Sequence, residues 1–336
     1  MIAEKIFSLL QPRAFKLWRH SALYRPEIVR NKAYLVASKK FSDCEYVNID
    51  SLKQSNQPYS LLTTVYNESK SIEDFLNSIL RQSAAPNELV ICDGGSGDNT
   101  IELIKAWQQK SQVKFPIRII AEGKCSIAKG RNLSAKKASN DILLFADAGT
   151  SLDKSWAEKM LKGFLQDVDL VCGWYKPVIE TNLQKAFAWF VLPKLNSIDP
   201  ATFLPSGRSL AVRKHVFQAV GGFPEHLSFA GEDSLFAAYA KTASRAVAFV
   251  PDAYCYWRLP GGFMKMIKTV FRYAKGDGET GELFWNYYIV LIDKIGALFV
   301  HLYFLTVSLF LSIYLEGSLF FNLTLVLATT DRKSVV

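Results

Sequence analysis

The sequence predicts an α/β protein with a mostly parallel sheet between layers of helices. Between residues 58 and 180, four apolar runs are suited to buried strands: SLLTTVY, ELVICD, IRIIA and DILLFAD. Each is followed by a stretch of helical periodicity: SIEDFLNSILRQ, NTIELIKAWQQ, SIAKGRNLSAKKA and SWAEKMLKGFLQ. Strands that are apolar throughout and alternate with helices are typical of a parallel sheet covered on both faces.

Composition and periodicity divide the chain into five zones. A basic, aromatic-rich lead-in covers residues 1–57, and the strand–helix alternation covers 58–180. Residues 181–260 are less regular and hold Gly and Pro clusters, which suits the site of a second substrate. The zones 261–294 and 295–336 are an amphipathic segment and an apolar segment with a polar tail. The lead-in opens with one apolar helical face, which either docks on the main domain or rests on lipid.

The last two zones predict attachment to a membrane. In FMKMIKTVFRYAK one helical face is apolar and the opposite face carries four basic side chains. Residues 295–315 contain no Asp, Glu, Lys or Arg, and about twenty apolar residues are enough to span a bilayer. The alternative is an unusually long core helix. Basic side chains before residue 295 predict a catalytic domain on the cytoplasmic side of the inner membrane.

The charge and the cysteines limit the partners and the compartment. The chain has 336 residues, 49% hydrophobic and 21% charged, with a net charge of +9. This charge suits an anionic partner: nucleic acid, an acidic membrane surface or a phosphate-bearing substrate. The five cysteines are scattered and form no CxxC pair, so neither zinc nor a disulfide framework is expected, and a reducing cytosol fits. The N-terminus does not resemble a signal peptide.

Two acidic residues follow predicted strands at the edge of the sheet where ligands bind. Asp93 ends ELVICD and is followed by glycines, including Gly95, that let a backbone approach a ligand closely. For these glycines, a tight strand-to-helix turn is the equally simple explanation. Asp147 ends DILLFAD, and a carboxylate leaving an apolar strand suits a hard cation such as Mg²⁺ or Mn²⁺. The alternative for Asp147 is a solvated loop aspartate.

Two further signals lie at predicted helix N-termini. Arg131 lies in KGRNLSAKKAS near the positive end of a helix, where anions are favoured. Glu232 and Asp233 begin the helix EDSLFAAYAK, where acidic residues also occur simply because they complement the helix dipole. There is no GxGxxG and no GxxxxGK[ST], so neither a standard dinucleotide fold nor a P-loop is expected.

Three segments together resemble family 2 glycosyltransferases. TTVYNESKSIEDFLNSILRQSAAPNELVICDGGSGDNT resembles their N-terminal signature, DILLFADAG their Asp-x-Asp metal-binding region, and GGFPEHLSFAGEDSLFAAYA their acceptor segment. The segments follow the family's order and spacing over residues 58–276, and FRYAKGDG before apolar helices is similar to membrane-attached bacterial members. The resemblance implies the GT-A fold and transfer from a UDP- or GDP-linked sugar to a saccharide or lipid-linked acceptor.

The resemblance also implies a role for each matching residue. Asp233 would be the general base, with Glu232 beside it. Asp147 would stand at a divalent cation and the diphosphate, and Asp93 would contact the base. The donor pocket would be lined by Asn67, Glu68, Asp93, Gly95, Arg131 and Asp147.

The chain departs from the family pattern at two places. Gly149 occupies the position of the second motif aspartate, so the metal shell is incomplete. Either Asp147, phosphate oxygens and water complete it, or a cation such as Arg258 replaces metal in part. No QxxRW motif is present, since Trp257-Arg258 has the opposite order, which weighs against a processive polymer synthase.

The sequence thus predicts an inverting transfer in the synthesis of cell-surface polysaccharide or glycolipid. One alternative is a sugar-nucleotide nucleotidyltransferase, although the glycine-rich basic loop of that class is missing after the first strand. A second is a non-catalytic membrane scaffold, against which the retained Asp93, Asp147 and Asp233 argue. A nucleic-acid binder is not expected, because no basic–aromatic recognition module is apparent.

Overall fold

The computed structural model describes residues 57–164, 168–193, 195, 203–227 and 230–280, and isolated positions beyond them (299, 302–307 and 310). The chain divides into one unit, Met1–Gly281, and a second, Glu282–Val336. The predicted N-terminal lead-in lies outside the described residues except for Gln57. The candidate site lies wholly in the first unit.

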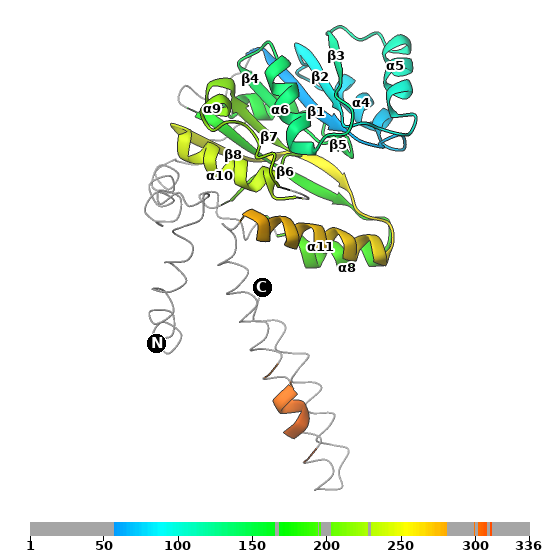
Figure 1. The fold of residues 1–336 in the computed structure, drawn as a ribbon, viewed down its shortest axis with the longest axis vertical. Helices are drawn as coiled ribbons and strands as arrows, with labels where there is room; N and C mark the ends of the chain where they lie inside the picture. Colours follow the sequence, from blue (N-terminus) through cyan, green and yellow to red (C-terminus); the bar gives the residue numbers. More distant parts are fainter. Residues whose placement is uncertain are drawn as a thin grey trace. The chain divides into compact units, whose positions relative to one another are not determined.

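One mixed sheet organises the first unit (Figure 1). Its strand order is β3-β2-β1-β4-β7-β6-β8-β5 over the ranges that the structure describes. The neighbours β3, β2, β1 and β4 run parallel, β7 is antiparallel to β4 and β6, β6 and β8 are parallel, and β5 is antiparallel to β8. The predicted α/β architecture with a mostly parallel sheet is therefore confirmed. The strands are β1 (Tyr59–Val65), β2 (Glu88–Asp93), β3 (Ile117–Ala121), β4 (Ile142–Phe145), β5 (Thr150–Leu152), β6 (Val168–Val178), β7 (Leu210–Arg213) and β8 (Ala246–Arg258).

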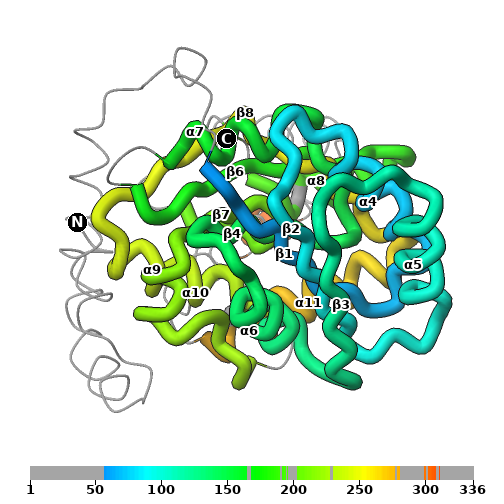
Figure 2. The backbone as a smooth tube through the Cα atoms, turned by 90° about the horizontal axis from the view of Figure 1, so that it is seen from above, coloured from blue at the N-terminus to red at the C-terminus, as the bar shows by residue number. Residues whose placement is uncertain are grey.

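Helices cover both faces of the sheet (Figure 2). Helices α4, α5 and α7 contribute buried side chains to the hydrophobic cluster on one face. Helices α6, α9 and α10 contribute to the cluster on the other. The helices are α4 (Ile72–Leu80), α5 (Thr100–Lys110), α6 (Ile127–Lys137), α7 (Trp156–Lys162), α8 (Asn182–Val191), α9 (Lys214–Ala219), α10 (Glu232–Ala243) and α11 (Phe263–Thr280).

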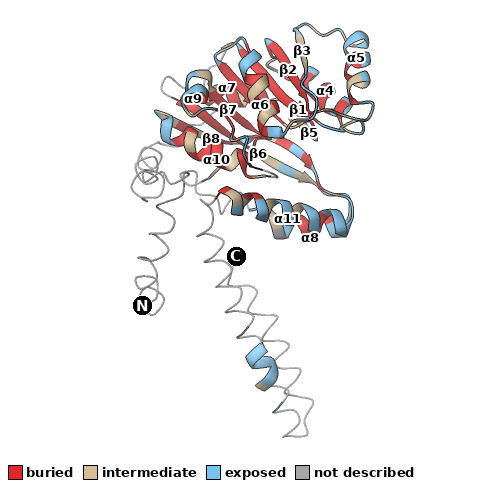
Figure 3. Ribbon diagram, viewed as in Figure 1, coloured by how far each residue is buried: buried red, intermediate tan, exposed pale blue. Residues whose placement is uncertain are grey.

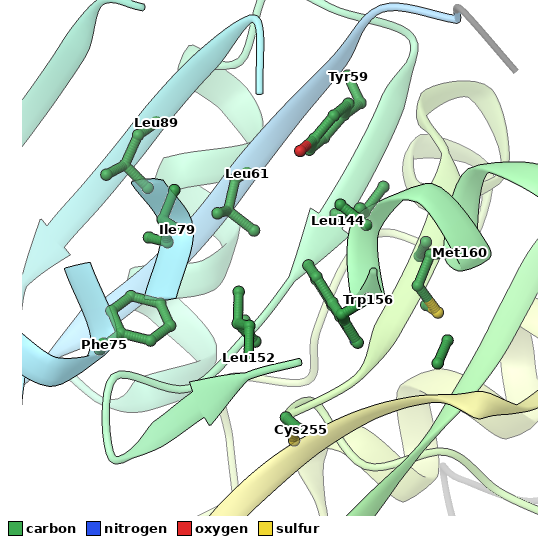
Figure 4. Close-up of a cluster of buried hydrophobic side chains, with 14 of the residues drawn as sticks. Tyr59, Leu61, Phe75, Ile79, Leu89, Leu144, Leu152, Trp156, Met160 and Cys255 are labelled. Atoms are coloured by element: carbon green, nitrogen blue, oxygen red, sulfur yellow. The ribbon is translucent and has the colours of Figure 1, made fainter. Parts of the chain in front are cut away.

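The alternation of side chains along β1 separates these two clusters. Leu61 belongs to the first and Leu62 to the second, and both are fully buried. In the first cluster Phe75 of α4 and Trp156 of α7 pack beside strand residues such as Leu144 (Figure 4). The central strands β1, β2 and β4 are buried almost throughout, whereas the edge strand β3 is half-buried or exposed (Figure 3). This packing fixes the strand ends, which carry the candidate site.

The sheet crosses the boundary that the sequence predicts near residue 180. Strand β6 ends at Val178, before the boundary, and it pairs with β7 and β8, which follow it. The two predicted halves therefore share one sheet. Their division into a donor half and an acceptor half stays a prediction about function.

Helices α8 and α11 pack on each other and on the end of β8. Phe187, Ala188 and Met266 form a cluster there with Trp257 and Leu259. The sequence predicts one apolar face on α11 made of Phe263, Met266, Ile267, Val270 and Ala274. Of these residues Met266 is buried and Val270 half-buried, whereas the other three are exposed.

No helix among the described residues is both long enough and apolar enough to cross a membrane. The predicted span, residues 295–315, lies outside the described residues except at positions 299, 302–307 and 310. The membrane span therefore stays a prediction.

Candidate active site

The candidate site lies at the carboxyl ends of three neighbouring parallel strands. β1 lies between β2 and β4, and Val65 at the end of β1 is paired with Asp93 at the end of β2. Asp147 follows the end of β4 by two residues. The topology therefore brings Asp93 and Asp147 to the same edge, as the sequence predicts.

The loops after β1 and β2 are tied together by hydrogen bonds. The Asp93 carboxylate accepts from the backbone N–H of Ser96 at 3.1 Å and of Gly95 at 3.3 Å. Asn67, with a left-handed φ of 55°, accepts at Oδ1 from the Gly97 N–H at 2.8 Å. Gly95 has φ 85°, and a Cβ there would lie 2.8 Å from the backbone nitrogen of Lys124, so a side chain does not fit without displacement. Since a carboxylate can accept about four hydrogen bonds, Asp93 retains acceptor capacity for a ligand.

Glu68 lies beside the position of the missing family aspartate. A Cβ built on Gly149 would be 3.8 Å from Glu68 Oε1. Glu68 Oε2 accepts a hydrogen bond from Ser71 Oγ. Burial raises the pKa of Glu68 and the charge of Asp147 adds to the rise, although the bond from Ser71 opposes both.

A buried arginine joins the loop after β4 to the start of α10. The Arg131 side chain on α6 is only 4% exposed, and its Nη2 lies 2.8 Å from Asp147 Oδ1 while its Nη1 lies 2.7 Å from Glu232 Oε1. Burial alone would lower the pKa of Arg131, but these two carboxylates raise it, so the guanidinium is charged. The sequence identifies Arg131 as a site residue but not its role as a bridge.

Gly207 makes room for this bridge. A Cβ on Gly207 would lie 2.3 Å from Arg131 Nη2, which is closer than two atoms can approach without displacement. The Gly207 N–H also donates to Asp233 Oδ2 at 3.0 Å. The sequence analysis missed Gly207, and the only signal for it is its place in the turn-like LPSGRS.

The two acidic residues that begin α10 differ in their surroundings. Glu232 is buried against Arg131, and its pKa is raised by burial and by Asp233, while Arg131 opposes the rise. Asp233 is half-buried and accepts from the backbone N–H groups of Gly207 and Ser234. Glu232 is thus engaged in an ion pair, whereas the hydrogen bonds that Asp233 accepts from Gly207 and Ser234 come from neutral backbone groups.

The sequence of this site matches two family descriptions. Residues 60–219 match "Glycosyl transferase family 2", and residues 142–330, more than half of the chain, match "Glycosyl transferase family group 2". This chain belongs to the family 2 glycosyltransferases.

Two curated relatives of this family 2 chain are similar over much of its length. It is 23% identical over 274 residues to the poly-β-1,6-N-acetyl-D-glucosamine synthase of Staphylococcus epidermidis, covering 74% of this chain and 64% of that protein. It is 29% identical over 225 residues to the glycosyltransferase AglE of Haloferax volcanii, covering 65% of this chain and 72% of that protein. The chain thus spans just under two thirds of the length of the synthase.

Solved structures of similar fold support the GT-A architecture. The mannosyltransferase PcManGT of Pyrobaculum calidifontis, in complex with GDP-Man and Mn²⁺, has a TM-score of 0.52 and 18% identity, covering 68% of this chain and 64% of that one. Staphylococcus aureus TarS 1–349, in complex with UDP-GlcNAc, has a TM-score of 0.50 and 22% identity, covering 62% and 60%. At such identities the likeness shows the fold alone.

One basic residue at the site was not identified from the sequence of this family 2 chain. Arg208 Nε lies 3.7 Å from Asp147 Oδ2, and its guanidinium lies 4.3 Å from the centre of the Trp257 ring. The sequence analysis instead names Arg258 as a cation near the leaving group. The structure pairs Arg258 with Asp74 of α4, and about half of its side chain is exposed.

The residues around Asp147 do not fit the divalent cation that the family resemblance implies. Within the described ranges no group of three or more His, Cys, Asp and Glu side chains could hold a metal ion. Gly149 supplies no side-chain oxygen, Glu68 Oε2 already accepts a hydrogen bond from Ser71, and Asp147 faces two guanidinium groups. The two guanidinium groups repel an incoming metal cation, and a hard metal ion needs several oxygen ligands that are not already engaged.

Proposed function

We propose that this protein is an inverting glycosyltransferase. It takes a sugar from a nucleoside diphosphate donor and passes it to a hydroxyl of a saccharide or lipid-linked acceptor, in cell-surface polysaccharide or glycolipid synthesis. Membership of family 2 and the GT-A-like sheet support this proposal. Mg²⁺ or Mn²⁺ is not part of it, because Asp147 faces two guanidinium groups and Gly149 offers no side-chain oxygen beside it.

The donor is proposed to bind over the linked loops after β1 and β2. Asn67, Glu68, Asp93 and Gly95 lie there, and Gly95 keeps the loop free of a side chain. Asp93 can accept a hydrogen bond from a base N–H or a ribose hydroxyl. Of the two solved structures of similar fold, one holds a GDP-linked and the other a UDP-linked sugar, so both are donor candidates.

The observation that carries the proposal is the position of Asp233. Its carboxylate is linked through Gly207 to the Arg131 bridge, which reaches Asp147 on the donor side. A single displacement needs one carboxylate to take the proton of the acceptor hydroxyl. Asp147 and Glu232 are engaged by Arg131, so Asp233 is the candidate base, and Glu232 is proposed to hold Arg131 in place.

Asp233→Asn tests this assignment. The amide preserves the shape but cannot accept the proton, so we expect transfer to fall about 10²–10⁴-fold while nucleoside diphosphate affinity is kept. Asp252→Asn is the matched control, because Asp252 is an exposed acid of β8 outside the site. Near-normal turnover of Asp233→Asn would remove it as the base.

We further propose that the protein works at the cytoplasmic face of an inner membrane. Helices α8 and α11 expose large apolar side chains: Leu183, Trp189, Phe263, Met264, Ile267 and Phe271. The side chains of Lys265, Lys268 and Arg272 are also exposed on α11 (Figure 3). An amphipathic helix with basic residues and exposed aromatic residues suits an anionic lipid surface.

Removal of residues 282–336 tests the two modes of attachment. We expect the intact chain to stay with membranes at high salt, and the shortened chain to bind anionic vesicles only at low salt. Phe263→Ser with Phe271→Ser in the shortened chain should then abolish vesicle binding. Full retention of the shortened chain at high salt would place the anchor elsewhere.

A further inference from the structure

The site near Asp147 holds a positive charge that the proposed function has not yet used. Arg208 precedes β7, and its side chain is 18% exposed. Nη1 donates to Ser206 Oγ at 2.9 Å, and Nη2 donates to Tyr273 Oη at 3.1 Å. With the Trp257 ring 4.3 Å away, these contacts hold the guanidinium in one position before any ligand arrives.

The charge of Arg208 is less fully neutralised than that of Arg131. Arg131 has carboxylate oxygens at 2.7 and 2.8 Å, whereas Arg208 lies 3.7 Å from the carboxylate oxygen of its ion-pair partner, Asp147. The two closer partners of Arg208 are neutral hydroxyls. Burial alone would lower the pKa of Arg208, but Tyr273, Asp147 and Asp233 raise it, so the group is a fixed cation.

The family's metal-binding position and Arg208 meet at the same carboxylate. Asp147 is the residue that matches the metal-binding region, and both of its oxygens face guanidinium groups. Arg208 therefore lies where a cation would be needed to offset charge on a departing diphosphate. Guanidinium groups suit phosphate oxygens because their N–H groups form a planar fork.

We propose that Arg208 supplies this positive charge in place of a divalent cation, and that transfer does not require metal. The inference rests on the proposed glycosyl transfer. In that step the acceptor oxygen bonds to the anomeric carbon, and the bond from that carbon to the β-phosphate oxygen breaks with its electron pair on the diphosphate. The hydroxyl proton goes to Asp233, and Arg208 neither gains nor loses a proton.

The experiment uses the full chain stripped of metal and held in excess EDTA. Transfer from UDP- and GDP-linked sugars is measured for the wild type, Arg208→Gln, Arg208→Lys and the control Arg118→Gln. Arg118 is a half-exposed arginine on β3. Binding of UDP, GDP and the corresponding nucleosides is measured by calorimetry in the same buffer, and thermal unfolding reports whether each variant is folded.

We expect the wild type to keep its activity in EDTA within twofold. Arg208→Gln should lose about 100- to 1,000-fold in kcat, as when one preorganised charge-stabilising donor is removed, and Arg208→Lys should recover part of it. Arg208→Gln should weaken diphosphate binding tenfold or more while nucleoside binding stays unchanged. If Arg208→Gln does not fold, the comparison with the wild type rests on Arg208→Lys, which keeps the charge but loses the planar fork.

Several results would overturn the proposal. Activity that disappears in EDTA and returns with Mn²⁺ would show that metal carries the leaving group. Normal kcat in folded Arg208→Gln would also refute it. If the wild type transfers no sugar from either donor, the proposed function fails, and unchanged diphosphate binding by Arg208→Gln would then refute the role of Arg208 separately.

Discussion

Replacing Arg131 with Met should destabilise the protein in a way that depends on pH. The substitution removes a buried guanidinium that pairs with Asp147 at 2.8 Å and with Glu232 at 2.7 Å. Removing one partner of a buried ion pair typically costs about 3–5 kcal/mol. A domain of ordinary stability, about 5–15 kcal/mol, would remain folded in most of this range.

The pH dependence follows from Glu232. Burial and Asp233 raise its pKa and Arg131 opposes them, so in Arg131→Met only a backbone hydrogen bond still opposes the rise. A carboxyl whose pKa is higher in the folded than in the unfolded state destabilises the fold when it ionises. The cost should therefore grow as the pH rises from about 4.5, the value of an ordinary glutamate, through the folded pKa.

Urea unfolding at pH 5 and pH 8 measures this effect. The loss of stability in Arg131→Met should be smaller at pH 5. Arg131→Met combined with Glu232→Gln should recover about 0.5–3 kcal/mol relative to the sum of the single changes, because the uncompensated charge is gone. The exposed Arg81→Met should change stability by no more than about 0.5 kcal/mol. An equal cost at both pH values, or strict additivity, would refute the bridge.

Two further substitutions test packing and a second buried charge. Gly207→Ala would place a Cβ 2.3 Å from Arg131, so thermal unfolding should show a loss of about 1–3 kcal/mol, whereas Gly97→Ala, with no atom within 4 Å, is the control. The buried Asp169 has a pKa that burial raises but Arg245 lowers more strongly, so it stabilises the fold above about pH 3.8 and this contribution is lost as the pH falls through its folded pKa. The loss of stability in Asp169→Asn should therefore be largest at pH 7 and should shrink as the pH is lowered below 3.8, and a loss that does not change with pH would contradict this assignment.

The first half of the fold could be predicted because its strands are short apolar runs, and β1, β2 and β4 are buried on both faces. ELVICD and IRIIA coincide with β2 and β3, and helix α6 begins after Ser126, whose side chain accepts from the Lys129 N–H. Continuous apolar runs leave few alternatives for such segments. The carboxyl-end rule then places Asp93 and Asp147 together without knowledge of any contact.

The second half could not be predicted equally well. Strand β6 (Val168–Val178) ends in WYKPV, with half-buried and exposed positions, and the short β7 (Leu210–Arg213) gains its partners from distant segments. For α11, periodicity shows that an apolar stripe exists but not which part of it finds a partner. The contact with α8 selects Met266 and leaves Phe263 exposed.

The role of Arg208 lay beyond sequence reasoning for a related physical reason. Its position depends on Asp147 after β4, on Trp257 at the end of β8, and on Tyr273 of α11. These three partners lie far apart in the chain, so no local sequence pattern predicts that they meet. The Asp-x-Asp region, by contrast, is a short motif, and the replacement of its second aspartate can be seen in the sequence. The sequence therefore reveals the gap at Gly149, and only the fold shows which cation lies beside it.

Asp147 contacts both Arg131 and Arg208, so replacing it should disturb both guanidinium groups. If it were only a metal ligand, Asp147→Asn would affect metal affinity and leave Arg131 and Arg208 in place. In the structure one carboxylate faces both guanidinium groups, and Arg131 extends the link to Glu232, which adjoins the candidate base. Neutralising Asp147 would leave two buried cations sharing the remaining acids, so donor binding and the alignment of Asp233 should weaken together. The donor and acceptor sides of this site thus form one electrostatic unit.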